Sequence, residues 1–445
     1  MRKRYFSTKK KDNLLFRIFV GVVLVLISIY GLYRLLWLTP VSAPGKEVPR
    51  IVKDKIFSRI ERGEKPQWEE ILKLREEKKI EELRKSLRSF VDTTKEPDEL
   101  AKAYILWLDV EEEVGSLEPA LDVAKEAREK CVGAKDYALI LYREGYILEK
   151  LGKDSEAGEI YNTVIKEFSK GNKCYGYLGL GRLSIKNGDK VKAREVANLA
   201  VVDAEWDSKI WNESLDLLGK LNVEMVFSKE ETPESKKYIV QRGDTLVGIG
   251  AKLNVPVGML CRANGLDENA VLRPNQVLKY TPKDFKLIVE RSKCRAFLVD
   301  ENGIFKRYIV GLGKTGHETT LGSYKIGNKQ KNPTWFKPGE APIPPGDPRN
   351  ELGTRWMPLV PAEPGLPSDL GLHGTIAPET IGTYSSNGCV RFLKDDIEEL
   401  YDLIVRSTPV IIKEIVKPED VFPLESINVE KVASERIEKP VEEKN

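Results

Sequence analysis

The sequence predicts a multidomain α+β protein with an N-terminal transmembrane helix, an all-α repeat-like region, a βααβ module and a mostly-β C-terminal domain. Three observations predict these parts. Residues 14–38 are almost wholly apolar, and apolar side chains recur every three or four positions through residues 50–226. From residue 237 onward, short alternating strands are separated by Gly, Pro and Asn. A chain of 445 residues is also long for one domain.

Composition narrows the possible functions before any motif is considered. The 72 basic and 69 acidic residues leave a formal net charge of +3, so no nucleic-acid partner is expected. The chain has two histidines and five cysteines, without CxxC or a cluster at metal-ligand spacing, so no metal and no cofactor are expected. The odd cysteine count predicts at least one free thiol and leaves a disulfide between two others open. Three cysteines are expected to be packed in helices and one to be partly exposed between strands, in the order Cys131, Cys174, Cys261 and Cys294.

The N-terminus predicts a membrane anchor, with a basic tail at residues 1–13 and a spanning helix at residues 14–38. The apolar run is long enough to cross a bilayer, and Arg17 and Arg34 lie near its ends, where they can reach the headgroups. The basic tail should stay cytoplasmic, which places the rest of the chain on the extracytoplasmic or periplasmic side of the cell (inner) membrane. A cleaved signal peptide is the alternative, because "VSAP" at residues 41–44 faintly resembles a cleavage site.

The region 50–226 carries a weak internal repeat. Three glycines spaced by 37 and 36 residues each precede an alanine by five positions; the pairs are Gly115 and Ala120, Gly152 and Ala157, and Gly188 and Ala193. Each unit predicts two helices joined by a glycine turn, which resembles tetratricopeptide repeats, although their usual period is 34. The alternative is an ordinary helical bundle. Repeat surfaces usually bind proteins, so a protein partner is expected here, and residues 226–237 are predicted to be a linker.

The segment 237–282 predicts strand, helix, helix, strand. After the strand "YIV", the turn "RGDT" supplies a cap, Asp244 or Thr245, for a helix that begins near Leu246. A second helix near residues 257–263 should end at Asn264–Gly265, and "NQVLKY" returns as a strand.

The same segment is similar to the LysM module, on the strength of "GDTL", "RANGL" and "PNQVL". Asn275 stands where that family usually has glycine, and asparagine tolerates the same left-handed backbone. LysM modules bind N-acetylglucosamine-containing glycans, chiefly peptidoglycan. The resemblance implies glycan contacts from the first turn and the end of the second helix, at Gly243, Asp244, Thr245 and Asn264. The alternative is a small capping domain that binds nothing.

Residues 285–416 predict a mostly-β domain. Asn302–Gly303 is a hairpin signal between "AFLVD" and "IFKRYIV", and "TTLGSYKIG" continues the sheet. Residues 332–375 are rich in Pro, Gly and aromatic residues and lack periodicity, which predicts a functional wall or lid. The helix "KDDIEELYDLI" and the strand "TPVIIKE" end the domain, and the charged tail 417–445 is expected to be disordered or loosely attached.

One string in this domain predicts chemistry. His373 ends the predicted strand "LGLH", and Cys389 follows sixteen residues later in "SSNGCVRF". A cysteine nucleophile needs a base, and histidine is the usual base near neutral pH. Gly388 permits a tight turn that would aim backbone N–H groups at an oxyanion. Arg391 would lie on the same side of an extended chain as Cys389, where it lowers the thiol pKa or grips a carboxylate.

The string "HGT…P…IG…S.GC.R" resembles the signature of the L,D-transpeptidase (YkuD) domain, and "TTLGSYKI", "NPTW" and "DPRNELGTRW" follow that family's order. Two departures are Asn387, where a histidine is frequent, and Thr320, where a proline is usual. The resemblance implies that Cys389 forms a thioester with a stem-peptide carbonyl and that His373 is the base and later the acid. The other implied residues are Gly374, whose carbonyl orients the imidazole, Gly388, Ser386 and Arg391 near the oxyanion or substrate, and Trp335 and Tyr384 along the groove.

The implied function is that of a membrane-anchored peptidoglycan L,D-transpeptidase. Such an enzyme releases D-alanine from a stem tetrapeptide and transfers the acyl group to an amine, which makes 3–3 cross-links. With water as acceptor the same site is an L,D-carboxypeptidase, and with a protein lysine it attaches a protein to the wall. A non-catalytic peptidoglycan-binding scaffold is the remaining alternative. The sequence does not separate the acceptors, because the acceptor site lies in loops without a readable pattern.

Overall fold

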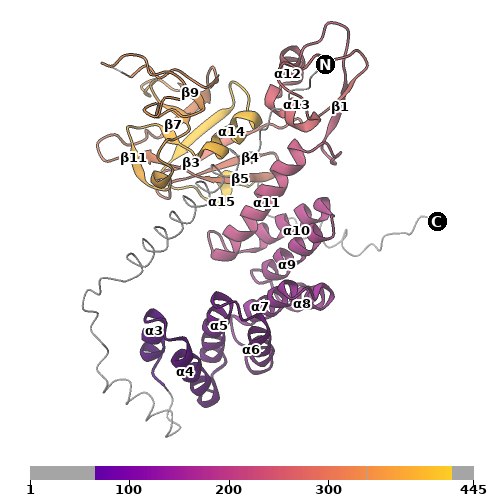
Figure 1. Ribbon diagram of the computed structural model, residues 1–445, viewed down its shortest axis with the longest axis vertical. Coiled ribbons are helices and arrows are strands. Elements are labelled where there is room, and N and C mark those ends of the chain that lie inside the picture. Colours follow the sequence, from indigo (N-terminus) through magenta and orange to yellow (C-terminus); the bar gives the residue numbers. More distant parts are fainter. Residues whose placement is uncertain (1–65, 338, 423–445) are drawn as a thin grey trace, which may run out of the picture. The chain divides into compact units, whose positions relative to one another are not determined.

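The computed structural model describes residues 66–337 and 339–422, and these fall into two compact units that divide after Lys95 (Figure 1). The predicted basic tail, transmembrane helix and most of the charged tail lie outside the described residues. Among the described helices, none is by itself long and apolar enough to cross a membrane; one pair satisfies the test jointly, with a bend of 110° between its members.

The first unit contributes two described helices, α3 (Trp68–Glu76) and α4 (Ile80–Thr93). Apolar side chains spaced three or four apart line the buried face of α4, and Leu83 and Leu87 are fully buried. The rings of Trp68 and Phe90 lie 5.5 Å apart and join the two helices. The helical character predicted for this part of the chain is therefore present.

The second unit begins with seven helices that follow one another along the chain (Figure 1). They are α5 (Pro97–Glu113), α6 (Leu117–Lys130), α7 (Tyr137–Lys150), α8 (Asp154–Glu167), α9 (Lys173–Lys186), α10 (Lys190–Asp203) and α11 (Lys209–Phe227). The first six form three pairs, and each pair turns at one of the three repeated glycines, whose φ angles lie between 75° and 80°. The three repeated alanines are fully buried, which lets the paired helices approach closely. The helical region is confirmed, while its likeness to tetratricopeptide repeats stays a prediction.

The βααβ module consists of β1 (Lys236–Ile239), α12 (Leu246–Leu253), α13 (Val257–Asn264) and β2 (Val277–Tyr280), with β1 and β2 antiparallel. Thr245, rather than Asp244, caps α12, since its hydroxyl accepts a hydrogen bond from the Gly248 N–H at 3.1 Å. Gly265 ends α13 in the left-handed conformation, and Asn275 adopts the left-handed backbone expected of it, with φ 67°.

The C-terminal domain is built on one large mixed sheet, in the order β12-β10-β9-β7-β13-β3-β4-β5, with β8 paired to β9. Its strands are β3 (Lys286–Glu290), β4 (Arg295–Asp300), β5 (Gly303–Ile309), β7 (Gly322–Ile326), β8 (Gln330–Lys331), β9 (Arg355–Pro361), β10 (Gly371–His373), β12 (Val390–Arg391) and β13 (Pro409–Lys413). A two-stranded sheet pairs β6 (Leu312–Gly313) with β11 (Tyr384–Ser386). The remaining elements are η1 (Pro378–Thr380), α14 (Lys394–Leu403) and α15 (Pro418–Val421).

The predicted hairpin, C-terminal helix and last strand are present as β4–β5, α14 and β13. The prediction that residues 332–375 form a loop without secondary structure beyond the strand at His373 is wrong for Arg355–Pro361. That stretch forms β9, which lies between β10 and β7 in the sheet. This strand could not be recognised from the sequence, because Pro358 interrupts its alternating pattern and because it lies within a long Pro- and Gly-rich segment.

A single hydrophobic core runs through the end of α11, the βααβ module and the large sheet. At the C-terminal end of α11, the buried ammonium of Lys279 donates hydrogen bonds of 2.7 Å to the carbonyls of Met225 and Ser228. The Arg194 guanidinium holds the Glu234 carboxylate in a bidentate pair. The predicted linker at residues 226–237 corresponds to residues 228–235, which connect α11 to β1 without helix or strand and are held by these contacts.

Two smaller expectations also need correction. The start of the tail is attached, because Val421 in α15 is 1% exposed and the Lys286 ammonium donates to the Asp420 carbonyl at 3.1 Å. Cys294 is buried rather than partly exposed, because its turn between β3 and β4 packs into the core. All five cysteines are free thiols, so the disulfide that was left open does not form.

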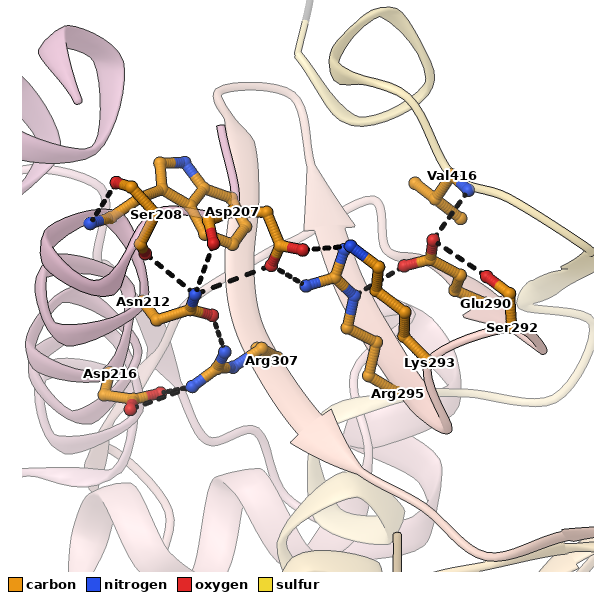
Figure 2. A network of polar contacts seen from close by, with 11 residues as sticks. Asp207, Ser208, Asn212, Asp216, Glu290, Ser292, Lys293, Arg295, Arg307 and Val416 are labelled. Atoms are coloured by element: carbon orange, nitrogen blue, oxygen red, sulfur yellow. Dashed lines mark hydrogen bonds and ion pairs between the residues drawn. The ribbon is translucent and has the colours of Figure 1, made fainter. Parts of the chain in front are cut away.

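Polar contacts join the beginning of α11 to the sheet (Figure 2). The Arg295 guanidinium on β4 pairs with the Glu290 carboxylate on β3 and with the Asp207 carboxylate before α11. Glu290 is 1% exposed and Arg295 4% exposed, while the rings of Trp211 and Phe297 lie within 6.0 Å and 5.0 Å of the guanidinium. Burial makes this pair expensive to break from one side only.

Replacing Arg295 by methionine is expected to lower the free energy of unfolding by about 3 kcal/mol, because Glu290 keeps a buried charge without its partner. The matched change Lys293→Met removes an ion pair with the same Asp207 from a side chain that is 50% exposed, and should cost less than about 1 kcal/mol. Urea unfolding followed by tryptophan fluorescence measures both values. Equal losses would contradict a special role for the buried pair.

Candidate active site

The candidate site lies on one face of neighbouring strands in the large sheet. β10 and β12 are parallel, and their register places His373 beside Arg391. Cys389 directly precedes β12, two residues before Arg391, so its side chain leaves the same face. On the other side of β10, His373 is opposite Trp356 of β9, which is in turn opposite Gln330 of β8. The sheet therefore brings into one row side chains that lie between Gln330 and Arg391 in the sequence.

A cavity of about 500 Å³ opens over this row. Its lining includes five of the residues predicted from the sequence, which are Trp335, His373, Ser386, Cys389 and Arg391. Residues that the sequence analysis did not assign also line it, among them Gln330, Glu351, Trp356 and Asp369. Trp356 was within reach of the sequence, because it belongs to the quoted stretch "DPRNELGTRW". Glu351 belongs to the same stretch, whereas Asp369 comes from a loop that carried no comparable signal.

Cys389 is half-buried, and its sulfur lies 3.9 Å from the backbone oxygen of Asp369. Burial raises the pKa of the thiol to about 11, and the Asp369 carboxylate acts in the same direction. A hydrogen bond from the Gly371 backbone and the charge of Arg391 lower that pKa, but they do not outweigh burial. Arg391 therefore lowers the pKa of the thiol, as the sequence predicted, but burial has the larger effect on that pKa.

His373 is 5% exposed, and its ring is tilted by 44° against that of Trp356, with 5.8 Å between the ring centroids. Burial lowers the pKa of the imidazole to about 4, and the charge of Arg391 adds to this effect. The Gly374 and Glu351 backbones oppose it by favouring the protonated ring. Within the described residues, Nδ1 of His373 makes no hydrogen bond of standard geometry. The hydrogen bond that this atom would donate to the Gly374 carbonyl, and that would orient the ring, therefore stays a prediction. The imidazole is neutral, and thus able to accept a proton, above about pH 4.

The turn before the cysteine is tightly held. Gly388 has φ 117°, and a side chain there would approach Leu370 to 3.2 Å, so glycine is required. The Ser386 hydroxyl accepts a hydrogen bond from the Gly388 N–H at 3.2 Å and donates one to the Cys389 carbonyl at 2.7 Å. Ser386 was expected to support the oxyanion or substrate, and both of these hydrogen bonds go to the backbone of the turn that carries Cys389.

Arg391 is 8% exposed, and its guanidinium donates to the Ser385 hydroxyl. Burial lowers the pKa of Arg391, while the charge of Glu351 raises it. No carboxylate among residues 66–337 and 339–422 forms an ion pair with it, and its Nε atom is buried without a hydrogen bond. A buried cation at the cavity wall is chemically suited to a carboxylate of a ligand.

Other predicted residues lie elsewhere. Tyr384 is not part of the cavity lining, and its hydroxyl donates to the Arg291 carbonyl at 2.9 Å. In the βααβ module, the Asn264 amide makes two hydrogen bonds to the Lys279 backbone, which tie α13 to β2, and one to the Leu260 carbonyl within α13. The Asp244 carboxylate accepts from the Gln241 N–H at 2.7 Å. Within the described ranges, no group of three or more His, Cys, Asp or Glu side chains is placed to hold a metal ion.

A thiol, an imidazole and an unpaired guanidinium around one cavity are the groups that cysteine-based acyl transfer uses. Comparison with known proteins agrees with this class. The L,D-transpeptidase catalytic domain model matches residues 284–412, and the LysM domain model matches residues 238–281.

Among similar proteins, YqjB of Bacillus subtilis, whose name places it among the L,D-transpeptidases, is 32% identical over 131 residues, which are 29% of this chain and 72% of the relative. YkuD of the same organism is 29% identical over 181 residues, which are 39% of this chain and 97% of the relative. The chain belongs to the L,D-transpeptidase family. L,D-transpeptidase 3 of Mycobacterium tuberculosis aligns at 13% identity over 32% of this chain and 76% of that one, with a TM-score of 0.24, too low to support an argument.

Proposed function

We propose that this protein is a peptidoglycan L,D-transpeptidase that uses Cys389 as its nucleophile. The observation that supports this most is that Cys389 and His373 leave the same face of adjoining segments and line one cavity. Two alternatives, a carboxypeptidase and an enzyme that attaches a protein to the wall, use the same nucleophile with a different acceptor. The third alternative, a non-catalytic scaffold, carries out no reaction.

The proposed reaction begins with a neutral pair. Because the pKa of Cys389 is about 11 and that of His373 about 4, thiol and imidazole are both uncharged at neutral pH. As the sulfur attacks the stem-peptide carbonyl, His373 takes the thiol proton and then gives it to the departing D-alanine nitrogen. An acceptor amine attacks the resulting thioester, loses a proton to His373, and returns the thiol to its starting state.

The remaining parts of the chain receive proposed roles from their chemistry. Arg391 holds a carboxylate of the stem peptide, and Trp335 lines the groove. The LysM module binds the glycan, with contacts from its first turn at Gly243 and Thr245. The helical region binds a protein partner, and the N-terminal segment anchors the chain in the cell membrane with the catalytic domain outside.

The test is incubation of the full chain with purified disaccharide-tetrapeptide muropeptides, followed by mass spectrometry of the products. Dimers with a 3–3 link support the proposal. Monomers trimmed by one D-alanine, without dimers, assign a carboxypeptidase instead, and stems joined to an added lysine-containing protein assign protein attachment. Unchanged muropeptides, with no thioester on the enzyme, support the alternative of a non-catalytic peptidoglycan-binding scaffold.

A further inference from the structure

Thr319 makes a contact that no part of the proposed mechanism uses. It lies in the segment before β7 and is fully buried. Its hydroxyl accepts a hydrogen bond from the Gly313 N–H on β6 at 2.9 Å. The same hydroxyl donates a hydrogen bond to the Gly388 carbonyl at 2.8 Å. The direction of this second bond is fixed, because a carbonyl oxygen can only accept and the hydroxyl has one proton to donate.

The Gly388 carbonyl belongs to the same peptide unit as the Cys389 N–H. A peptide unit is planar and trans, so its carbonyl and its N–H point in opposite directions. A hydrogen bond that fixes the Gly388 oxygen therefore also fixes where the Cys389 N–H points. Polarisation through the amide also makes that N–H a better donor.

This N–H is a donor that the turn leaves available at the cavity. The Gly388 N–H already bonds to the Ser386 hydroxyl at 3.2 Å. Across the described part of the chain, the Cys389 N–H donates to no protein acceptor, although the residue is half-buried at the cavity. An N–H on the nucleophile itself is suitably located to meet the oxygen of the carbonyl that the sulfur attacks.

We infer that Thr319 is a positioning residue that aims the Cys389 N–H at the oxyanion formed during acylation. Thr319 acts through the Gly388–Cys389 peptide and does not touch the substrate. Gly388 adopts φ 117°, a conformation that its neighbours must hold in place, and Thr319 and Ser386 hold it from its two sides. This inference rests on the proposed nucleophile, Cys389.

The test compares two reactions of the same sulfur. Acylation by ertapenem, a β-lactam, passes through an oxyanion, whereas alkylation by iodoacetamide does not. Thr319→Val keeps the shape of the side chain and removes the hydroxyl, and Thr319→Ser keeps the hydroxyl. In the full-length chain, Thr319→Val should slow acylation about 30-fold, while alkylation changes less than about twofold. The expected slowing is smaller than the roughly 10²- to 10³-fold loss for removing an oxyanion donor, because the Cys389 N–H is misdirected and not removed. Thr319→Ser should acylate at close to the wild-type rate.

Intact-mass spectrometry measures both rates, and thermal unfolding confirms that each variant is folded. Equal slowing of acylation and alkylation would overturn the inference, since it would mean that the whole turn has moved. An unchanged acylation rate in folded Thr319→Val would also overturn it. If Thr319→Val does not fold, Thr319→Ser and Thr319→Cys are compared instead. The thiol of the cysteine variant is a weaker hydrogen-bond donor than a hydroxyl, so this variant should show slower acylation and unchanged alkylation of Cys389. Wild-type protein that ertapenem does not acylate contradicts the proposed nucleophile instead.

Discussion

Replacing Cys389 by alanine is expected to abolish the thioester intermediate and to reduce cross-link formation by roughly 10⁴-fold or more, because the variant lacks the sulfur that forms the thioester. The structure supports this expectation, because Cys389 is the one cysteine that lines the cavity described above. Mass spectrometry of the intact protein after incubation with muropeptides measures the intermediate, and chromatography of the muropeptides measures the product.

The matched control is Cys294→Ala, which removes a buried thiol from a turn of the same domain. That variant should keep its activity, apart from any loss that follows from reduced stability. Cross-linked product from folded Cys389→Ala protein would show that the chemistry runs through another residue, and the proposed function would have to be abandoned.

Replacing His373 by glutamine is expected to lower the rate roughly 10³-fold at pH 7, as for the loss of a general base. With a thiol pKa of about 11, only about one enzyme molecule in 10⁴ carries an unaided thiolate at pH 7. The variant must rely on that fraction. Its rate should therefore rise about tenfold for each pH unit until the pH approaches the thiol pKa.

Wild-type protein should behave differently. The pKa of His373 is lowered to about 4, so the base is present above that pH and is lost as the pH falls through it. The rate should be nearly level from about pH 5 to neutrality and should fall on the acidic side. His317→Gln is the matched control, because His317 is the only other histidine and lies exposed in a turn. A flat pH profile in the His373 variant would contradict the role of His373 as base.

Local sequence signals predicted the parts of the fold that depend on neighbouring residues. The Thr245 cap, the Asn302–Gly303 hairpin and the glycine turns of the helical pairs each follow from backbone preferences of a few residues. The pairing of His373 and Cys389 on one face was also within reach, since each stands next to a short strand. These features needed no knowledge of distant contacts.

Features set by tertiary contacts were not predictable in this way. β9 forms because β7, from before the long Pro- and Gly-rich segment, and β10, from after it, both supply its hydrogen bonds. The pKa of Cys389 rises because the domain closes around it, and its sign cannot be deduced from the neighbouring Arg391 alone. Tyr384, two residues from Ser386, lies outside the cavity lining while the distant Glu351 is part of it, because short strands and loops redirect the chain.

The continuous core beneath α11, the LysM module and the sheet has a consequence for a polymeric substrate. A binding module on a flexible linker raises the local concentration, at the active site, of every stem peptide within reach of that linker, whatever the distance between neighbouring stem peptides. A module fixed by Lys279 and by shared apolar packing instead keeps a constant distance to Cys389. If the module holds a glycan strand as proposed, only stem peptides at a fixed distance along that strand from the bound sugar reach the sulfur. The protein would then select stem peptides by their position on the strand, whereas a flexibly linked module would not.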